Sequence, residues 1–387
     1  MANYDSINLT SKSILHNNHS TVIIGSHSKL LDDDDEFDQH SDETLRLIKS
    51  QFSTRKNNKN KFFYIRKFLT YALCILLLIS IFSFLFKQNN TVKDKIVMLI
   101  SIDSFTPRYL NFNVTPTISS LAANGVRAKF MEPVYPSSTF PNHFSLVTGL
   151  YPESHGIIAN VFYDTSDNSV FTYTNPLDAN NSKWWLGEPI WITAEKNNVR
   201  SATCMWPGSE AEIQGFRPSI YEKFSYMDLH TKIDKIFSWL DLPDFPRLIT
   251  LYIPEVDSAG HTSGPESQLV KDNLALVDKE INYLLDGLKY RGIRENVDLI
   301  IVSDHGMTDT TGNYLTYCLE GQHGFNPEMP DMHAMFIANG PSFPKNVVLE
   351  GFKNLEIYEM LCNILSIPAA PNNSTAFFST SKILQNT

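Results

Sequence analysis

The chain contains few cysteines and carries no excess of basic residues. Four cysteines in 387 residues are too few for a disulfide-rich scaffold. Cys74 lies in a long apolar run, and the sequence leaves the pairing of Cys204, Cys318 and Cys362 open. Lys and Arg number 32 against 42 Asp and Glu, which gives a net charge of -10. No nucleic-acid-binding surface is therefore expected, because a phosphate backbone favours a basic face.

Glycine-rich phosphate loops and internal repeats are also missing. No stretch follows the G-x-G-x-x-G or the Walker pattern, both of which place backbone amides around a phosphate. The sequence therefore does not indicate a nucleotide-binding site of either type.

The first 60 residues are polar, rich in Asn, Ser and Asp, and include an acidic run at residues 32–36. Such a segment cannot bury enough apolar surface to offset the entropy of ordering. We expect residues 1–60 to form a disordered tail. The acidic run is interpreted as a solvated segment, with a trafficking or interaction signal as the alternative.

An uncharged apolar stretch, residues 68–86, follows this tail. It is long enough to cross a bilayer as a helix, and it begins too far from Met1 for a secretory signal peptide. Basic residues are more frequent before it than after it, which places the N-terminus in the cytoplasm and the remaining chain in an extracellular or lumenal space. The sequence thus predicts a single-pass type II membrane protein, with a buried core helix as the alternative.

Five N-x-S/T triplets after the apolar stretch agree with this orientation and suggest a glycoprotein. The motif is common by chance, so the triplets only support the topology. They begin at Asn89, Asn113, Asn180, Asn372 and Asn373.

From about Lys93 onward, apolar runs of strand length alternate with stretches of helical spacing. This alternation is typical of an α/β fold, a mostly parallel sheet with helices on both faces. We therefore predict one folded domain, residues 93–376, whose oligomeric state the sequence does not indicate. Its predicted strands are residues 95–103, 247–257, 297–306 and 333–340, and its predicted helices are residues 115–125, 268–290 and 355–365.

Acidic residues stand at the ends of three of these strands, two of them with a histidine close behind. Side chains beyond the carboxyl ends of neighbouring strands converge in open α/β sheets. With one further histidine, they form a mixed oxygen and nitrogen donor set suited to two divalent ions, with zinc as the first choice. The residues are Asp103, Asp257, His261, Asp304, His305 and His323.

The stretch "PSSTFPNHFSLVTG", residues 136–149, contains a candidate nucleophile. Thr139 stands between Pro136 and Pro141, before a helix that we expect to begin near Asn142 with its amides facing an anion. A threonine hydroxyl is a weak nucleophile, but a bound metal ion lowers its pKa. We interpret Thr139 as an attacking group on a stiff loop, the alternative being an ordinary loop residue before a helix.

Six stretches carry a resemblance to one known family: "MLISIDSFTPRYL", "TPTISSLAANGV", "PSSTFPNHFSLVTGLYPESHGIIAN", "EVDSAGHTSGP", "SDHGM" and "HGFNPEMPDMHAMF". In this order they resemble the nucleotide pyrophosphatase/phosphodiesterase family of the alkaline phosphatase superfamily, and most of all its fungal type II membrane members. The resemblance implies an alkaline-phosphatase-like fold. It also implies hydrolysis of nucleotide phosphodiester and pyrophosphate bonds to nucleoside monophosphates through a phospho-threonine intermediate.

The resemblance also implies two zinc ions and divides the candidate ligands between them. The ligands are Asp103, Asp304 and His305 for the ion that Thr139 also binds, and Asp257, His261 and His323 for the other.

Three further residues receive roles from the resemblance. Asn160 would donate to a phosphate oxygen, Phe140 would pack on the base of a nucleotide substrate, and Phe224 would form the second wall of that slot. The family-like residues that we interpret as structural are His143, Glu153 and His155.

One departure from the family affects this assignment. Only "GMTDTTGNYLTYCLEGQ" separates His305 from His323, where family members carry a long block that adds strands and part of the site wall. The domain is therefore expected to be shortened between residues 306 and 322. Two alternatives to an active nucleotide phosphodiesterase follow: an inactive variant without part of the site wall, and a phosphodiesterase of phospholipid headgroups, which Phe140 disfavours.

Overall fold

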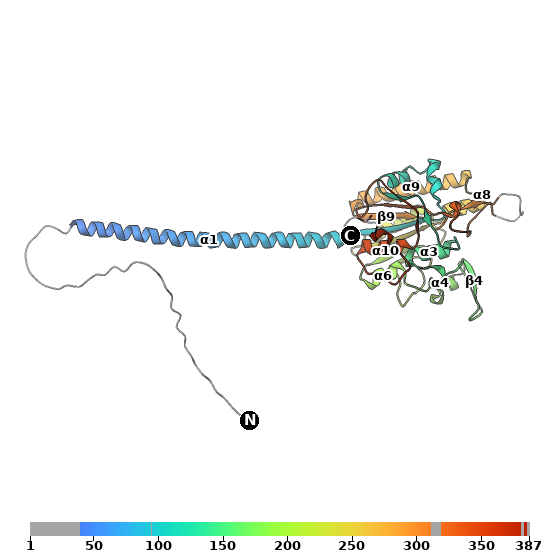
Figure 1. The fold of residues 1–387 in the computed structure, drawn as a ribbon, viewed down its shortest axis with the longest axis horizontal. Helices are drawn as coiled ribbons and strands as arrows, with labels where there is room; N and C mark the ends of the chain where they lie inside the picture. The colour runs from blue at the N-terminus through green and yellow to red at the C-terminus, as the bar shows by residue number, and fades with distance from the viewer. Residues whose placement is uncertain (1–38, 94, 311–318, 381–382, 385–387) are drawn as a thin grey trace, which may run out of the picture. The chain divides into compact units, whose positions relative to one another are not determined.

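The computed structural model describes residues 39–93, 95–310, 319–380 and 383–384. The chain divides into two units, Met1–Ser83 and Phe84–Thr387, whose ribbons are drawn in Figure 1. The acidic run of the tail and Cys318 lie outside the described residues.

Helix α1, Gln39–Lys93, contains the described part of the first unit. Its stretch Lys61–Ser83 is long and apolar enough to cross a membrane, by length and composition alone, and its large apolar side chains are exposed. The structure contradicts the expected disorder of residues 39–60, which are helical. Leu, Arg, Lys and Glu in this segment favour helix, and a helix extends from an existing one without a new nucleus.

An eight-stranded sheet forms the centre of the second unit, in the order β13-β2-β12-β9-β1-β8-β6-β7. The strands from β9 to β7 run parallel, and β12 is antiparallel to both of its neighbours. This confirms the predicted mostly parallel sheet. The strands are β1 (Ile96–Ile102), β2 (Val126–Ala128), β6 (Ser201–Cys204), β7 (Ile220–Glu222), β8 (Leu248–Ile253), β9 (Val297–Val302), β12 (Phe336–Asn339) and β13 (Val347–Leu349).

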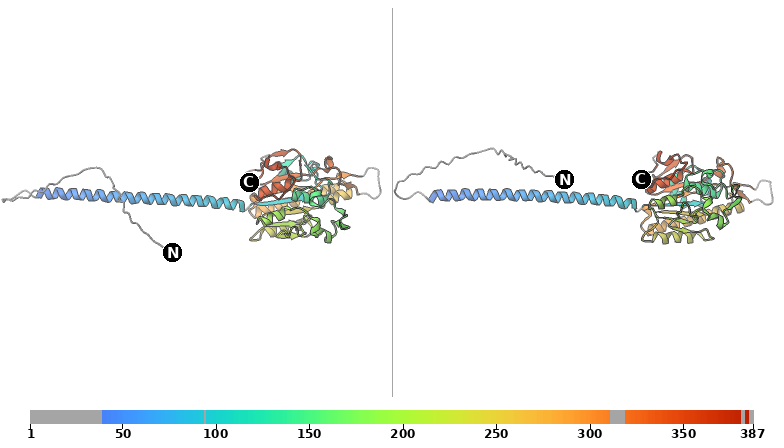
Figure 2. Two further views of the ribbon diagram at one scale, coloured as in Figure 1. Left: turned by 60° about the horizontal axis from the view of Figure 1, so that its bottom comes forward. Right: turned by 90° about the horizontal axis from the view of Figure 1, so that it is seen from below.

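Helices cover both faces of this sheet, as Figures 1 and 2 show for α9 on one face and α6 and α10 on the other. Alternate side chains of β1 enter different cores: Val97 packs with α3, α6 and α10, and Met98 packs with α7 and α9. The strand is buried throughout because both of its faces are covered. The longer helices of this unit are α2 (Pro116–Ala123), α3 (Thr139–Thr148), α6 (Ile190–Lys196), α7 (Leu229–Leu240), α8 (Glu255–Ser263), α9 (Gln268–Tyr290) and α10 (Glu356–Leu365).

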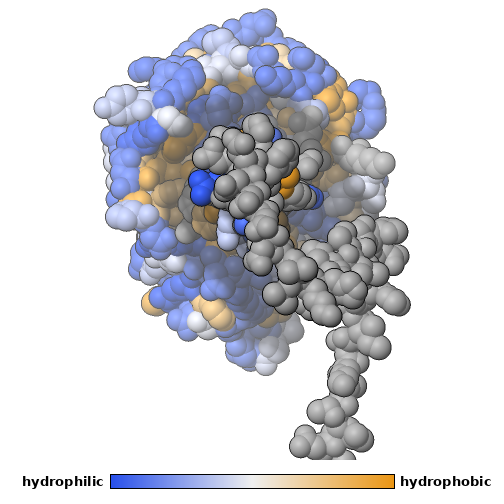
Figure 3. Space-filling model, turned by 90° about the vertical axis from the view of Figure 1, so that its left-hand side faces the viewer, coloured by the Kyte–Doolittle hydropathy of each residue, from blue (hydrophilic) through white to orange (hydrophobic). Residues whose placement is uncertain are grey.

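Hydrophilic side chains dominate the rim of this unit on the face seen in Figure 3. Short helices and strands complete the unit. Three two-stranded ribbons pair β3 with β14, β4 with β5, and β10 with β11. The short elements are β3 (Met131–Glu132), β4 (Val161–Asp164), β5 (Ser169–Thr172), β10 (Thr308–Asp309), β11 (Gly321–Gln322), β14 (Phe352–Lys353), α4 (Pro152–His155), α5 (Pro176–Ala179), α11 (Phe377–Thr380), η1 (Pro107–Phe112), η2 (Ser182–Trp184), η3 (Arg294–Asn296) and η4 (Pro330–Met332).

Two predicted boundaries near the candidate site are wrong. The second strand ends at Ile253, and α8 begins at Glu255, so Asp257 lies in a first helical turn rather than at a strand end. Helix α3 begins at Thr139 rather than near Asn142, because a proline in the first turn of a helix removes an N–H that has no intrahelical acceptor.

The start of α2 is capped by a side chain of another helix. The Thr115 hydroxyl makes no capping hydrogen bond. Instead, the carboxylate of Asp278 on α9 accepts from the backbone N–H groups of Thr117 and Ile118. A tertiary contact thus supplies the acceptor that an N-cap side chain usually provides.

Candidate active site

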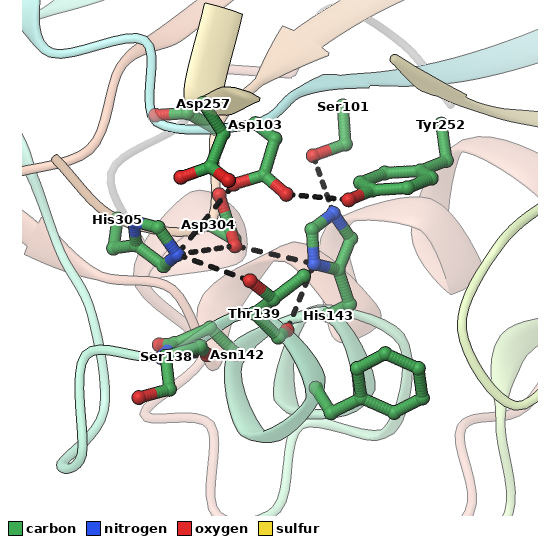
Figure 4. Close-up of polar contacts among 12 residues, drawn as sticks. Ser101, Asp103, Ser138, Thr139, Asn142, His143, Tyr252, Asp257, Asp304 and His305 are labelled. Carbon is green, nitrogen blue, oxygen red and sulfur yellow. Dashed lines mark hydrogen bonds and ion pairs between the residues drawn. The ribbon is translucent and has the colours of Figure 1, made fainter. Parts of the chain in front are cut away.

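Six Asp and His side chains meet at the carboxyl end of the central strands (Figure 4 shows four of them). Five of them, all except Asp304, form two groups whose potential metal-binding atoms each lie within 4.8 Å of one another. One group contains Asp103, Asp257 and His305, and the other contains Asp257, His261 and His323. Since Asp257 belongs to both, the two groups adjoin.

The first part of the site is completely buried. Asp103 follows β1, and Asp304 and His305 follow β9. The Nε2 atom of His305 lies 3.0 Å from Oδ2 of Asp304 and 3.5 Å from Oδ1 of Asp103. These side chains are at most 1% exposed, so parallel strands bring them together as the strand-end pattern predicts.

The second part is more accessible and rests on a helix. Asp257 and His261 lie four residues apart on one face of α8, with His261 Nε2 at 3.5 Å from Asp257 Oδ2. His323 comes from the segment after β11, and its Nε2 lies 3.7 Å from Asp257 Oδ1. The three side chains are 10–21% exposed. The structure thus places all six predicted ligands in one site.

Each of the three histidines has its Nδ1 atom next to a backbone carbonyl. The partners are Gly306 for His305 at 2.9 Å and Gly321 for His261 at 2.8 Å, and His323 has Ser137 at 3.0 Å. In a neutral ring whose proton is on Nδ1, the carbonyl accepts from that N–H, and Nε2, which is directed at the carboxylates, is the nitrogen available to a metal ion. This is the arrangement that metal-binding histidines use.

The burial of the carboxylates and their unpaired oxygens are compatible with a cation bound in the site. Burial raises the pKa of Asp103, and the charges of Asp304 and Asp257 raise it further. The Oδ1 atoms of Asp103 and Asp257 are buried and accept no hydrogen bond from the described part of the chain. Burial also raises the pKa of Asp304, but His305 and His143 outweigh it and hold this pKa well below its usual value. Buried carboxylates this close together are stabilised by metal ions, which supply the missing positive charge.

Thr139 is the first residue of α3 and faces the buried part of the site. Its Oγ1 lies 3.4 Å from Nε2 of His305, and the residue is 8% exposed. The preceding loop is attached to the His323 segment, because Gly324 N–H donates to the carbonyl of Ser137 at 2.8 Å. The candidate nucleophile and the last ligand therefore share one scaffold.

Asn160 and Phe140 lie next to this nucleophile. The Oδ1 atom of Asn160 accepts from the N–H of Phe140 at 2.9 Å, so its Nδ2 group is the one that can donate to a ligand. The ring of Phe140 lies 5.3 Å from that of Tyr173. Phe224 belongs to a different aromatic group: it is 53% exposed, and its ring lies 6.5 Å from Tyr252.

The segment after β9 places His323 in the candidate site. Strands β10 and β11 pair antiparallel, and the N–H of Glu320 donates to the carbonyl of His261 at 3.1 Å. A Cβ atom at Gly321 would lie 2.5 Å from the carbonyl oxygen of Gly260. The lack of a side chain at Gly321 thus allows β11 to pack directly on the backbone of α8, which brings His323 beside Asp257.

Two side chains that contact the site were missed or misjudged from the sequence. Tyr252 donates to Asp103, and the His143 ring, which we interpreted as structural, lies 3.3 Å from Asp304. The available signals were a tyrosine in an otherwise apolar strand and a histidine one helical turn after Thr139. His155 is structural: it is buried, contacts Ser145, and burial lowers its pKa to about 3.

Cys204 and Cys362 are buried and unpaired. They belong to different cores, which agrees with the interpretation that this fold is not a disulfide scaffold.

Comparison with known proteins gives a consistent result. The pattern of the family described as type I phosphodiesterase / nucleotide pyrophosphatase matches residues 97–352. The chain is 32% identical to ectonucleotide pyrophosphatase/phosphodiesterase family member 3 of Mus musculus over 375 residues, which cover 72% of this chain and 43% of the mouse protein. It is 34% identical to an uncharacterized pyrophosphatase/phosphodiesterase of Schizosaccharomyces pombe over 391 residues, which cover 75% of this chain and 81% of that protein.

These figures show that the chain spans less than half of the mouse relative and most of the yeast one. The mouse alignment runs over 375 positions but covers only 72% of this 387-residue chain. A considerable part of the alignment therefore faces no residue of this chain.

A solved structure of murine ectonucleotide pyrophosphatase/phosphodiesterase 5 is similar, with a TM-score of 0.71 and 27% identity over 75% of this chain and 100% of that one. That structure is an inactive threonine-to-alanine variant in complex with AMP. The human counterpart has the same TM-score and identity.

Proposed function

The chain belongs to the type I phosphodiesterase / nucleotide pyrophosphatase family, and we propose that it is a zinc-dependent hydrolase of nucleotide phosphodiester and pyrophosphate bonds. The observation that carries this proposal is the position of Thr139, which begins a helix and whose hydroxyl lies 3.4 Å from His305 of the buried Asp/His group. The products would be a nucleoside monophosphate and an alcohol or phosphate.

The family is metal-dependent, and nitrogen and carboxylate donors together favour zinc. Two zinc ions, when bound, would lower the pKa of the attacking hydroxyl and stabilise charge on the entering and leaving oxygens. The residues that would hold them are Asp103, Asp304 and His305 for one ion, together with Thr139, and Asp257, His261 and His323 for the other.

Thr139 would act in two steps. Its Oγ1 forms a bond to phosphorus, the bond to the leaving alcohol or phosphate breaks, and the threonine proton passes to the leaving oxygen through solvent, which gives a phospho-threonine. Water then attacks the same phosphorus and restores the threonine hydroxyl as the nucleoside monophosphate leaves. The positive end of the α3 dipole would face the developing negative charge. The inactive threonine-to-alanine relative supports this role.

Asn160 and two aromatic residues would bind the substrate. Because Phe140 N–H occupies Oδ1 of Asn160, the Nδ2 group is free to donate to an equatorial phosphate oxygen. Phe140 and Phe224 would contact the nucleobase from the two aromatic groups described above. The AMP bound to a relative supports a nucleotide substrate.

The alternative of an inactive variant receives little support. It rests on the block that the relatives have and this chain lacks. However, β11 packs on α8 without that block and holds His323 Nε2 at 3.7 Å from Asp257. The alternative of a phospholipid-headgroup phosphodiesterase keeps the same chemistry and differs only in the group that Phe140 contacts.

We further infer a single-pass type II membrane topology, with a cytoplasmic N-terminus and an extracellular or lumenal catalytic unit. The apolar stretch of α1 and its exposed side chains support the membrane span. Asn113, which begins an N-x-T triplet, is exposed, as a glycosylation acceptor must be.

The test uses the purified full chain in detergent and a chromogenic ester of thymidine monophosphate. We expect hydrolysis that a chelator abolishes and added zinc restores. The same turnover before and after complete metal removal would refute the metal-dependent mechanism. A choline-phosphate ester of the same chromophore decides between the nucleotide and the phospholipid-headgroup reading.

A further inference from the structure

Three buried polar side chains lie directly behind the candidate ligands in the described part of the chain. They are Ser101 on β1, Tyr252 on β8 and His143 on α3. Figure 4 shows that all three point toward Asp103, Asp304 or each other. None of them contributes an atom to either metal-binding group.

Tyr252 holds one oxygen of Asp103. Its hydroxyl donates to Oδ2 at 2.5 Å, while Oδ1 is directed at Nε2 of His305, 3.5 Å away. A hydrogen bond from a hydroxyl to a carboxylate is among the stronger ones in proteins. It therefore fixes the rotation of the carboxylate and leaves Oδ1 as the oxygen available to a metal ion.

His143 joins the nucleophile's helix to the end of β9. Its Nδ1 atom lies 2.8 Å from the carbonyl oxygen of Thr139 and 3.3 Å from Oδ2 of Asp304. Its Nε2 atom lies 2.8 Å from the hydroxyl of Ser101. A ring that carries its proton on Nδ1 donates to the Thr139 carbonyl, faces Asp304 with the same N–H, and accepts from Ser101.

Aromatic contacts hold these two side chains in place. The His143 ring packs edge-on against Tyr252 at 4.9 Å and against Trp206 at 5.2 Å. The indole N–H of Trp206 donates to the carbonyl of His143 at 3.2 Å. Tyr252 and His143 are thus held by packing contacts that do not involve the candidate metal ligands.

We propose that Tyr252 and His143 are positioning residues: Tyr252 orients Asp103 toward the metal site, and His143 sets the position of Asp304 relative to Thr139. This inference rests on the metal-dependent function proposed above. Residues that hold metal ligands in place typically change metal affinity or activity about tenfold to a hundredfold when they are removed.

The first experiment measures zinc affinity by competition with a chromophoric chelator, on the purified full chain. Tyr252→Phe removes one hydroxyl and keeps the ring that packs on His143. We expect zinc binding about tenfold to a hundredfold weaker. The matched control is Tyr358→Phe, since Tyr358 is also buried and its hydroxyl contacts Thr193 and Ala370 in the other core. This control should lower stability and leave zinc affinity unchanged.

The second experiment separates positioning from packing at His143. His143→Asn keeps a donor near the Nδ1 position, and His143→Leu removes it at similar bulk. At saturating zinc, we expect His143→Asn to retain most of the kcat and His143→Leu to lose about tenfold to a hundredfold of it, with little change in KM.

The outcomes separate this inference from the function on which it rests. Wild-type zinc affinity in Tyr252→Phe, or an equal kcat in the two His143 variants, would overturn the positioning roles. A wild-type chain that binds no zinc would overturn the proposed function first. If the variants of one residue do not fold, the other experiment still tests the proposal. One experiment concerns the Tyr252 hydroxyl, and the other concerns the donor at the His143 Nδ1 position.

Discussion

The Nε2 atom of His323 lies 3.7 Å from Oδ1 of Asp257, although only a short segment connects β9 to β11. The contact exists because β11 packs closely on the backbone of α8, which Gly321 allows because it has no side chain. A short segment is therefore sufficient to bring His323 to the other candidate ligands.

Replacement of His323 should remove one ion and keep the other. In His323→Ala we expect bound zinc to fall from about two to about one per chain, because Asp103, Asp304 and His305 form a separate, buried group. Zinc content after gel filtration measures this. His333→Ala is the control, since this ring stacks on Phe130 outside the site. Retention of both ions in His323→Ala would remove His323 from the ligands.

The close packing of β11 on α8 can be tested by a single methyl group. In Gly321→Ala, the new Cβ would lie 2.5 Å from the carbonyl oxygen of Gly260, so we expect a loss of about 1–3 kcal/mol in the free energy of unfolding and weaker binding of the second zinc ion. Gly215→Ala is the control: it meets no atom within 4 Å but has a φ of +78°, so it should cost stability alone. Equal zinc binding in both variants would contradict the proposed route by which His323 is placed.

Asn160 should act through its amide donor. Asn160→Asp keeps an oxygen that accepts from Phe140 N–H but replaces the donor with a negative charge, so kcat should fall about a hundredfold or more. Asn168→Asp makes the same change between β4 and β5. This side chain is exposed, so the change should have no effect on kcat. A normal kcat in Asn160→Asp would exclude contact with the phosphoryl group.

Phe140 should select the base rather than the chemistry. With Phe140→Leu, we expect a higher KM for a thymidine-monophosphate ester and an unchanged KM for a choline-phosphate ester, because only the first substrate has a ring to stack on. Phe224→Leu should act in the same direction if both aromatic groups contact the base. Equal losses on the two esters would show that these rings have no role in base recognition.

His155 makes stability depend on pH. Its Nδ1 accepts from Ile157 N–H, its Nε2 lies 2.9 Å from Ser145 Oγ, and burial lowers its pKa from 6.5 to about 3. The unfolded chain therefore binds a proton here at a higher pH than the folded chain. This contribution to stability is present above the unfolded pKa of 6.5 and is lost as the pH falls toward 3.

Urea unfolding of the wild type and His155→Asn, both metal-free, at about pH 7.5 and about pH 5 measures this effect. Asn can still accept from Ile157 N–H but does not titrate, so its stability should fall less between the two values, by up to about 1.4 kcal/mol per pH unit. An identical pH dependence in both proteins would contradict a neutral buried His155.

The parts of the fold that follow from local pattern were predictable from the sequence. Helix α9 has the predicted bounds because helical spacing of apolar residues continues from Gln268 to Tyr290 and Gly292 follows. The start of α3 was misplaced because Pro141, which reads as a loop residue, is tolerated in a first helical turn.

The same distinction holds within the site. The ligands at the ends of β1 and β9 were predictable, because parallel strands bring their carboxyl ends to one edge. The role of Tyr252 was not, since a hydrogen bond between β8 and the residue after β1 depends on strand order. Likewise, whether a short segment could place His323 depended on the close packing of β11 on α8, for which Gly321 is the main sign in the sequence.

The central claim is that Thr139 is the nucleophile, and turnover of the thymidine-monophosphate ester by Thr139→Ala tests it most directly. We expect a loss of at least about a thousandfold in kcat with zinc content close to that of the wild type. Thr148→Ala on the same helix, which removes a buried hydroxyl bonded to the Phe144 carbonyl, should keep its activity. Turnover by zinc-loaded Thr139→Ala at the wild-type rate would contradict the account.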